Sequence, residues 1–135
     1  PGPARLAGAA GAGRPGILRN ILHPEELDAY IASAEKLGVS GAELHAVMPR
    51  VYGEIIRALV SRTGIGTLVV FGGDTLVGIL EAFGKKSVIP LAEAFPGVVT
   101  ARVPGVPNPR YLTTKAGGFG GEDLLPKLLR LARGF

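Results

Sequence analysis

Apolar residues spaced along one helical face predict two helices in the first half of the chain. The first begins near Pro24, a residue suited to the first turn of a helix, and Gly38 is placed to end it. Its predicted apolar face consists of Leu27, Tyr30, Ile31 and Ala34. Ser40 and Glu43 then have the spacing of a capping box, which predicts the start of a second helix.

The second helix has the clearest apolar stripe in the chain. Its predicted buried positions are Leu44, Val47, Met48, Val51, Tyr52, Ile55, Ile56, Leu59 and Val60. Pro49 lies inside this stripe and predicts a bend, because proline removes a backbone donor and clashes with the preceding turn. We expect Tyr30 and Tyr52 to pack in the core rather than to contact a cofactor.

Beyond Gly64 the pattern changes to short runs rich in β-branched residues. These predict strands at 67–71, 88–91, 98–103 and 110–114, with helices at 75–83 and 123–133. In the strand at 98–103, Val99, Ala101 and Val103 alternate with Thr100 and Arg102. This order of elements predicts an α/β fold: a single domain with a mixed sheet flanked by helices and two strand–Gly-rich loop–helix units.

Composition narrows the protein class. The chain has 135 residues, enough for one domain, and its 21 Gly and 11 Pro show that loops carry much of the architecture. We expect residues 1–16, rich in Gly, Ala and Pro, to be a flexible linker or boundary, and residues 17–135 to form the domain. The absence of cysteine excludes disulfides, zinc ribbons, iron–sulfur centres and thiol nucleophiles, and it fits the cytoplasmic location that we expect.

Two segments share the form of a strand, a glycine-rich turn and a helix. The first contains Gly72, Gly73, Asp74 and Thr75, and the second contains Lys115, Gly117, Gly118 and Gly120. Such turns place backbone N–H groups and the positive end of a helix at the carboxyl edge of a sheet, which suits a phosphate. Lys115 adds a positive charge, Thr75 a hydroxyl, and Asp74 a carboxylate that could hold magnesium.

Simpler interpretations stay open for both segments. Neither contains a P-loop or a G-x-G-x-x-G motif, so the first could be a tight turn with Asp74 or Thr75 as N-cap. Lys115 could equally be an exposed surface lysine. The other candidates are weaker: His23 precedes a helix, His45 falls on an exposed helical side, and no aromatic–basic interleaving indicates nucleic acid.

The order and spacing of the motifs resemble a known family. Leu68-Val-Val-Phe-Gly-Gly-Asp-Thr75, followed by Leu112-Thr-Thr-Lys-Ala-Gly-Gly-Phe-Gly120, resembles the C-terminal nucleotide-binding domain of the four-carbon acid sugar kinase family. The intervening stretch 89–98, with Glu93 and Pro96-Gly97, is also similar to that family. The resemblance covers residues 65–125.

This resemblance implies an ATP- and magnesium-dependent kinase that phosphorylates a four-carbon sugar acid of the erythronate, threonate or oxo-tetronate type. It implies cofactor contacts at Gly72, Gly73, Asp74, Thr75, Lys115, Gly117, Gly118 and Gly120, with Asp74 as the magnesium residue. Asp74 and Lys115 are also the candidate catalytic residues. The family's N-terminal sugar-acid domain has no counterpart in these 135 residues, so we expect that domain or a partner chain to complete the enzyme.

Two further hypotheses remain. The chain could be a non-catalytic nucleotide- or phosphometabolite-binding module that acts with a partner chain, or a structural domain whose glycine turns bind nothing. We also expect a homo-oligomer or a partner-shaped apolar face near the glycine loops, because a domain that belongs with another half exposes apolar surface.

Overall fold

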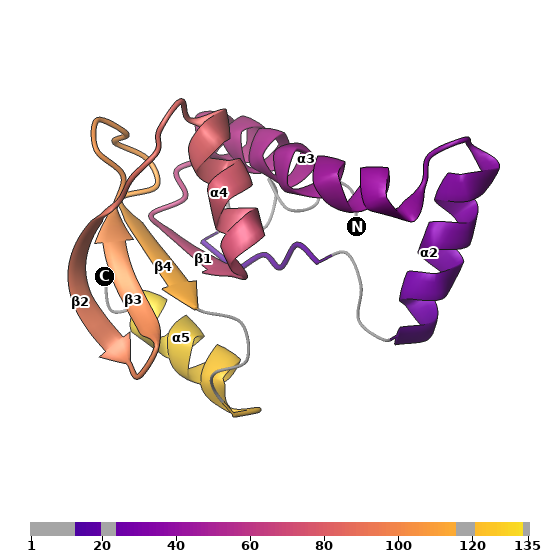
Figure 1. Cartoon of the computed structure of the whole chain (residues 1–135). Coiled ribbons are helices and arrows are strands. Elements are labelled where there is room, and N and C mark those ends of the chain that lie inside the picture. Colours follow the sequence, from indigo (N-terminus) through magenta and orange to yellow (C-terminus); the bar gives the residue numbers. More distant parts are fainter. Residues whose placement is uncertain (1–12, 20–23, 116–120, 134–135) are drawn as a thin grey trace.

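The computed structural model describes residues 13–19, 24–115 and 121–133. In this part of the chain it is an α/β domain with four helices and a four-stranded mixed sheet, as expected (Figure 1). The helices are α2 (Pro24–Lys36), α3 (Gly41–Arg62), α4 (Gly73–Ala82) and α5 (Leu124–Arg133). The strands are β1 (Thr67–Phe71), β2 (Ile89–Phe95), β3 (Val98–Arg102) and β4 (Tyr111–Lys115).

The order of the strands is β1-β4-β3-β2. β4 pairs in parallel with β1 and antiparallel with β3, while β2 and β3 form a hairpin. The parallel register runs from Thr67 opposite Tyr111 to Phe71 opposite Lys115. β1 and β4 therefore end side by side at one edge of the sheet.

Helices cover both faces of the sheet. α3 and α4 pack on one face in a core that includes Ile56, Ile79 and Leu112. α5 packs on the other through Leu124 and Leu128, against Val98. Figure 1 shows α5 across the sheet from α3 and α4.

Two threonines lie inside the sheet. Thr100, one of the polar positions that alternate in the strand at 98–103, is buried, and so is Thr113. They lie opposite each other on β3 and β4, and Thr113 lies opposite Val69, which packs against the α5 cluster. A hydrogen bond of 3.1 Å between the two hydroxyls satisfies them, so burial carries little penalty.

α3 and α4 cross in backbone contact. A Cβ on Gly53 of α3 would overlap the carbonyl of Gly78 in α4, and a Cβ on Gly78 would overlap the backbone of Pro49. Pro49 lies within a single helical segment, and Gly78 of α4 packs directly against its backbone. The two glycines allow a contact that side chains would prevent.

In the first half of the predicted apolar stripe, two positions are exposed and the others are half-buried. The capping box of Ser40 and Glu43 is present and Gly38 ends α2 with a positive φ, as expected. However, Val47 and Val51 are 41% and 38% exposed, and Tyr30 is 42% exposed with its hydroxyl 3.5 Å from Met48 Sδ. The expectation of a core position for Tyr30 is wrong, because α2 lies at the end of α3 far from the sheet (Figure 1).

Several element boundaries differ from the predicted ones. α4 begins at Gly73, two residues before the predicted start, because Gly72 serves as its N-cap. β2 continues to Phe95 instead of ending at Leu91, and Pro96 and Gly97 connect it to β3. Glu93 stabilises that turn, since its carboxylate accepts a hydrogen bond of 2.9 Å from the Gly97 amide.

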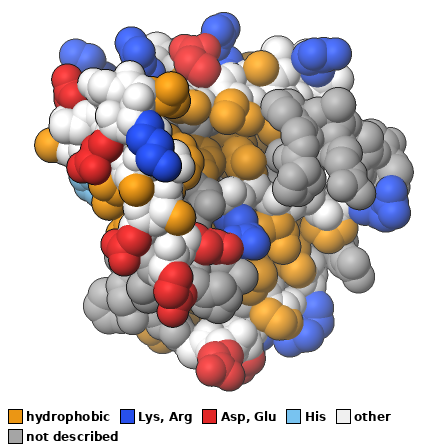
Figure 2. Space-filling view, turned by 90° about the vertical axis from the view of Figure 1, so that its right-hand side faces the viewer, with side chains coloured by type: hydrophobic (Ala, Val, Ile, Leu, Met, Phe, Trp, Pro, Cys, Tyr) orange, Lys and Arg blue, Asp and Glu red, His pale blue; other side chains and the backbone are white. Residues whose placement is uncertain are grey.

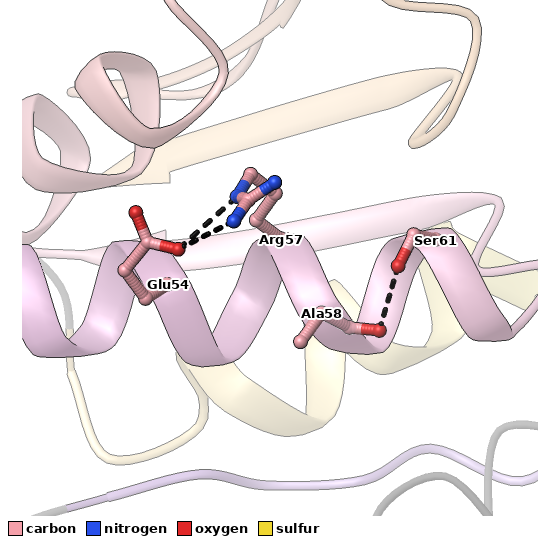
Figure 3. Close-up of polar contacts among 4 residues, drawn as sticks. All are labelled: Glu54, Arg57, Ala58 and Ser61. Atoms are coloured by element: carbon pink, nitrogen blue, oxygen red, sulfur yellow. Dashed lines mark hydrogen bonds and ion pairs between the residues drawn. The ribbon is translucent and has the colours of Figure 1, made fainter.

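The outer surface of α3 carries ordinary local contacts (Figure 3). Arg57 donates to Glu54 at 2.8 Å, and the Ser61 hydroxyl donates to the Ala58 carbonyl at 3.0 Å. Both pairs are exposed and lie within one or two turns of the same helix. They identify a solvated face with no feature of a site.

Candidate functional site

The first glycine turn and the end of β4 meet at one edge of the sheet. Phe71, the last residue of β1, lies opposite Lys115, the last residue of β4. The Gly72 amide extends this pairing by donating to the Lys115 carbonyl at 3.3 Å. Five of the predicted binding residues are therefore grouped: Gly72, Gly73, Asp74, Thr75 and Lys115.

The start of α4 offers backbone donors. Gly72 has φ 98° and ψ 138°, a conformation that side chains rarely adopt, and it is the N-cap of the helix. No side-chain cap occurs at this end of α4 among the described residues. A Cβ on Gly73 would meet nothing within 4 Å, so the space beside the first turn is open. The amides of the first turn therefore fit an anion.

The positions of Asp74 and Thr75 decide one open question. Both lie in the first turn of α4, after the N-cap, so neither is the capping residue that the simpler interpretation required. Asp74 is exposed and Thr75 is half-buried. Among the described residues no group of three or more His, Cys, Asp or Glu could hold a metal ion. A single carboxylate fits magnesium only in the mode in which phosphate oxygens and water supply the other ligands.

Lys115 adds positive charge at the same edge. Its ammonium Nζ lies 5.7 Å from the centre of the Phe71 ring. Because Phe71, Lys115 and Val98 are in register across three strands, their side chains share the face that α5 covers. The start of α4 approaches this edge from the opposite face, so the site combines donors from both sides of the sheet.

Three predicted binding residues cannot be placed. Gly117, Gly118 and Gly120 lie outside the described residues. Of the weaker candidates, His45 is exposed. His23 also lies outside the described residues.

A hollow of about 310 Å³ adjoins the site and was not predicted from the sequence. Its lining residues are Phe95, Pro96, Val98, Gly121, Asp123, Leu124 and Lys127. The Pro96-Gly97 pair was a recognisable turn signal, but only the register that places Val98 opposite Lys115 brings this turn to the same edge. A hydrogen bond and the charge from Lys127 hold the pKa of the Asp123 carboxyl below its ordinary value.

Comparison with known proteins identifies the chain's relatives. Residues 4–125 match the family described as "Nucleotide-binding C-terminal domain". The chain is also similar to a crystal structure of a protein with a domain of unknown function from Bordetella bronchiseptica, solved as a domain-swapped dimer with bound citrate. The identity is 30% and the TM-score 0.57, and the similarity covers 63% of this chain and 22% of that one. No match was found among curated proteins.

The family match spans most of the chain and includes the sequences of both glycine segments. The similarity to the Bordetella protein spans about a fifth of that protein's length. The chain belongs to the family of nucleotide-binding C-terminal domains. This is the domain of the four-carbon acid sugar kinase family, which the chain's two glycine motifs resemble.

Proposed function

We propose that this chain is the ATP-binding C-terminal domain of a kinase that phosphorylates a hydroxyl of a four-carbon sugar acid. The observation that carries the proposal is that the start of α4 and Lys115 lie together at one edge of the sheet, joined by the hydrogen bond from the Gly72 amide to the Lys115 carbonyl. Among the described residues, no side chain caps this start of α4. Family membership supports the nucleotide. The sugar acid, of the erythronate, threonate or oxo-tetronate type, rests on the sequence resemblance.

The site's residues suit the binding and orientation of phosphates. The amides of Gly73, Asp74 and Thr75 would donate to phosphate oxygens, and the Lys115 ammonium would neutralise their charge. Asp74 would hold magnesium, which when bound neutralises further phosphate charge. Holding the phosphates in line with an acceptor hydroxyl is most of what a phosphoryl-transfer enzyme needs from such a domain.

The remainder of the active site would come from another domain or chain. We propose that an N-terminal sugar-acid domain or a partner chain binds the acid and supplies the general base. The domain-swapped dimer of the Bordetella relative supports assembly into a homo-oligomer. We also propose a cytoplasmic location, on the lack of cysteine. In the described part of the chain, no helix has the length and apolarity needed to cross a membrane.

A second candidate function is a nucleotide- or phosphometabolite-binding module without catalysis of its own. It is favoured by the simplicity of the described site, in which Asp74 is the one carboxylate on the first turn of α4. Such a module would act with a partner chain and would bind the same phosphates through the same amides.

Thermal unfolding with and without millimolar ATP–magnesium tests the binding. A ligand that binds only the folded state at a hundredfold excess over its Kd stabilises that state by about 2.7 kcal/mol. We expect the melting temperature to rise by several degrees. No rise would contradict both candidate functions and favour a structural domain.

Phosphoryl transfer separates the two candidates. The chain is combined with the N-terminal domain of a family member, and release of ADP is followed with a set of four-carbon sugar acids. Acid-dependent ADP release supports the kinase. As a control, the same N-terminal domain must be active when it is combined with its own C-terminal domain. If this chain then binds nucleotide but releases no ADP with any of the acids, the kinase proposal is contradicted.

A further inference from the structure

The hollow beside α5 lies next to the proposed phosphate site. Val98, in its lining, is directly opposite Lys115 on the neighbouring strand, and Lys115 is opposite Phe71, which precedes Gly72. Neighbouring strands lie ~4.8 Å apart, so about 10 Å of sheet edge separates β1 from the hollow. The start of α4 lies on the opposite face, so an extended nucleotide with its phosphates there would cross this edge to place its other end near Val98.

The lining suits the uncharged end of such a ligand. Phe95, Pro96, Val98 and Leu124 provide an apolar wall with one aromatic ring. The volume of about 310 Å³ lies within the range of ~300–1,000 Å³ typical of small-molecule sites. A flat base can stack on a ring and bury its faces against such a wall.

The polar residues that line the hollow also suit the uncharged end of the ligand. Asp123 and Lys127 both line the hollow and form an ion pair with each other. A carboxylate repels phosphate oxygens but accepts hydrogen bonds from sugar hydroxyls. The charge of Lys127 is balanced by Asp123, so the mostly apolar hollow is better suited to a nucleoside than to a second phosphate.

We propose that the hollow formed by the β2–β3 turn and the start of α5 binds the base and ribose of the nucleotide whose phosphates lie at the start of α4. This inference rests on the proposed nucleotide function and adds a base subsite to it. Phe95 would contact the base, and Asp123 would accept hydrogen bonds from the ribose hydroxyls.

A substitution that fills the hollow tests this assignment. A Cβ on Gly121 would make ordinary contact, 3.4 Å from Asp123 Oδ1, so Gly121→Leu adds bulk at the mouth without disturbing the core. The matched control is Gly66→Leu, because a Cβ on Gly66 would meet nothing within 4 Å and this residue precedes β1 at its opposite end. Melting temperatures without ligand verify that both variants remain folded.

Calorimetric titrations with ATP and with inorganic tripolyphosphate, each with magnesium, separate the two ends of the ligand. We expect the parent to bind ATP about tenfold or more tightly than tripolyphosphate, as base stacking would provide. Gly121→Leu should weaken ATP binding about tenfold and leave tripolyphosphate binding unchanged, while Gly66→Leu should match the parent for both ligands.

Other results would overturn the base subsite. Equal affinity of the parent for ATP and tripolyphosphate, or parent-like ATP binding by a folded Gly121→Leu, would show that the base lies elsewhere while the phosphate site stands. If Gly121→Leu does not fold, Asp123→Asn replaces it: an equal effect on both ligands, or none, would overturn the assignment. Failure of the parent to bind either ligand would overturn the proposed function as well.

Discussion

At the scale of single residues, the site depends on positions that pattern alone could not distinguish from turn chemistry. Gly72 could be identified as a turn glycine, but its role as N-cap, which leaves Asp74 and Thr75 inside the helix, required the backbone. Lys115 could be identified as a charge, but its place beside Gly72 follows from the register of β4 with β1. Strand register between distant segments is set by tertiary packing and cannot be obtained from local sequence.

Lys115→Ala tests the charge at the site. Charge-assisted hydrogen bonds contribute about 1.5–3 kcal/mol, so loss of the ammonium should weaken ATP–magnesium binding by roughly 10- to 150-fold. The melting temperature without ligand should change little, since Lys115 is at the end of a strand. The control is Lys86→Ala, an exposed lysine outside the site. Equal affinities of parent and Lys115→Ala in calorimetry would remove Lys115 from the site.

At the scale of elements, two features determine where α3 begins and how it packs. A capping box marks its start, and glycine contacts allow its close crossing with α4. The box was predictable because its spacing is local. The crossing was not, because Gly53 and Gly78 are 25 positions apart and each resembles an ordinary helix-weakening glycine in sequence. Their value lies in the close approach that they permit.

Gly78→Ala should destabilise the domain although alanine favours helices. The new methyl group would overlap the Pro49 backbone, and overpacking of this kind costs about 1–3 kcal/mol. Gly64→Ala is the control, since a Cβ there meets nothing within 4 Å. Chemical denaturation measures both variants. A Gly78→Ala domain as stable as the parent would show that α3 and α4 do not cross in backbone contact.

The capping box gives a pH dependence. Hydrogen bonds from Ser40, first from its backbone amide and then from its hydroxyl, hold the pKa of Glu43 below its ordinary value of 4.5. A lowered folded-state pKa contributes stability that is present above pH 4.5 and is lost as the pH falls through the folded-state value. The stability difference between the parent and Glu43→Gln should therefore be present at neutral pH and shrink in acid. A difference independent of pH would contradict the box.

At the scale of the whole molecule, α2 and the first half of α3 expose apolar side chains that a self-contained domain would cover. The exposed set includes Leu27, Tyr30, Val47 and Val51. Figure 2, which views the molecule from the right-hand side of Figure 1, shows hydrophobic side chains gathered near the centre of this face with charged ones around them. The sequence predicted these side chains as apolar helix faces but could not show that they stay exposed in the folded domain.

This surface predicts self-association, in line with the oligomer proposed above. Sedimentation measurements over a range of concentrations should show the parent associating, and Val47→Glu should shift it toward the monomer by placing a charge in the apolar face. Ile89→Glu, on the edge strand β2, is the matched control and should associate like the parent. A parent that is monomeric at all concentrations would contradict this prediction.

Nuclear magnetic resonance of the labelled chain during titration with ATP–magnesium tests the central claim most directly. At 13.9 kDa, backbone amides should be observable one by one. The account predicts that the largest and saturable shifts occur at the amides of Gly73, Asp74 and Thr75, with Lys115 beside them. Saturable shifts confined to other parts of the chain, or none at millimolar ATP, would contradict it.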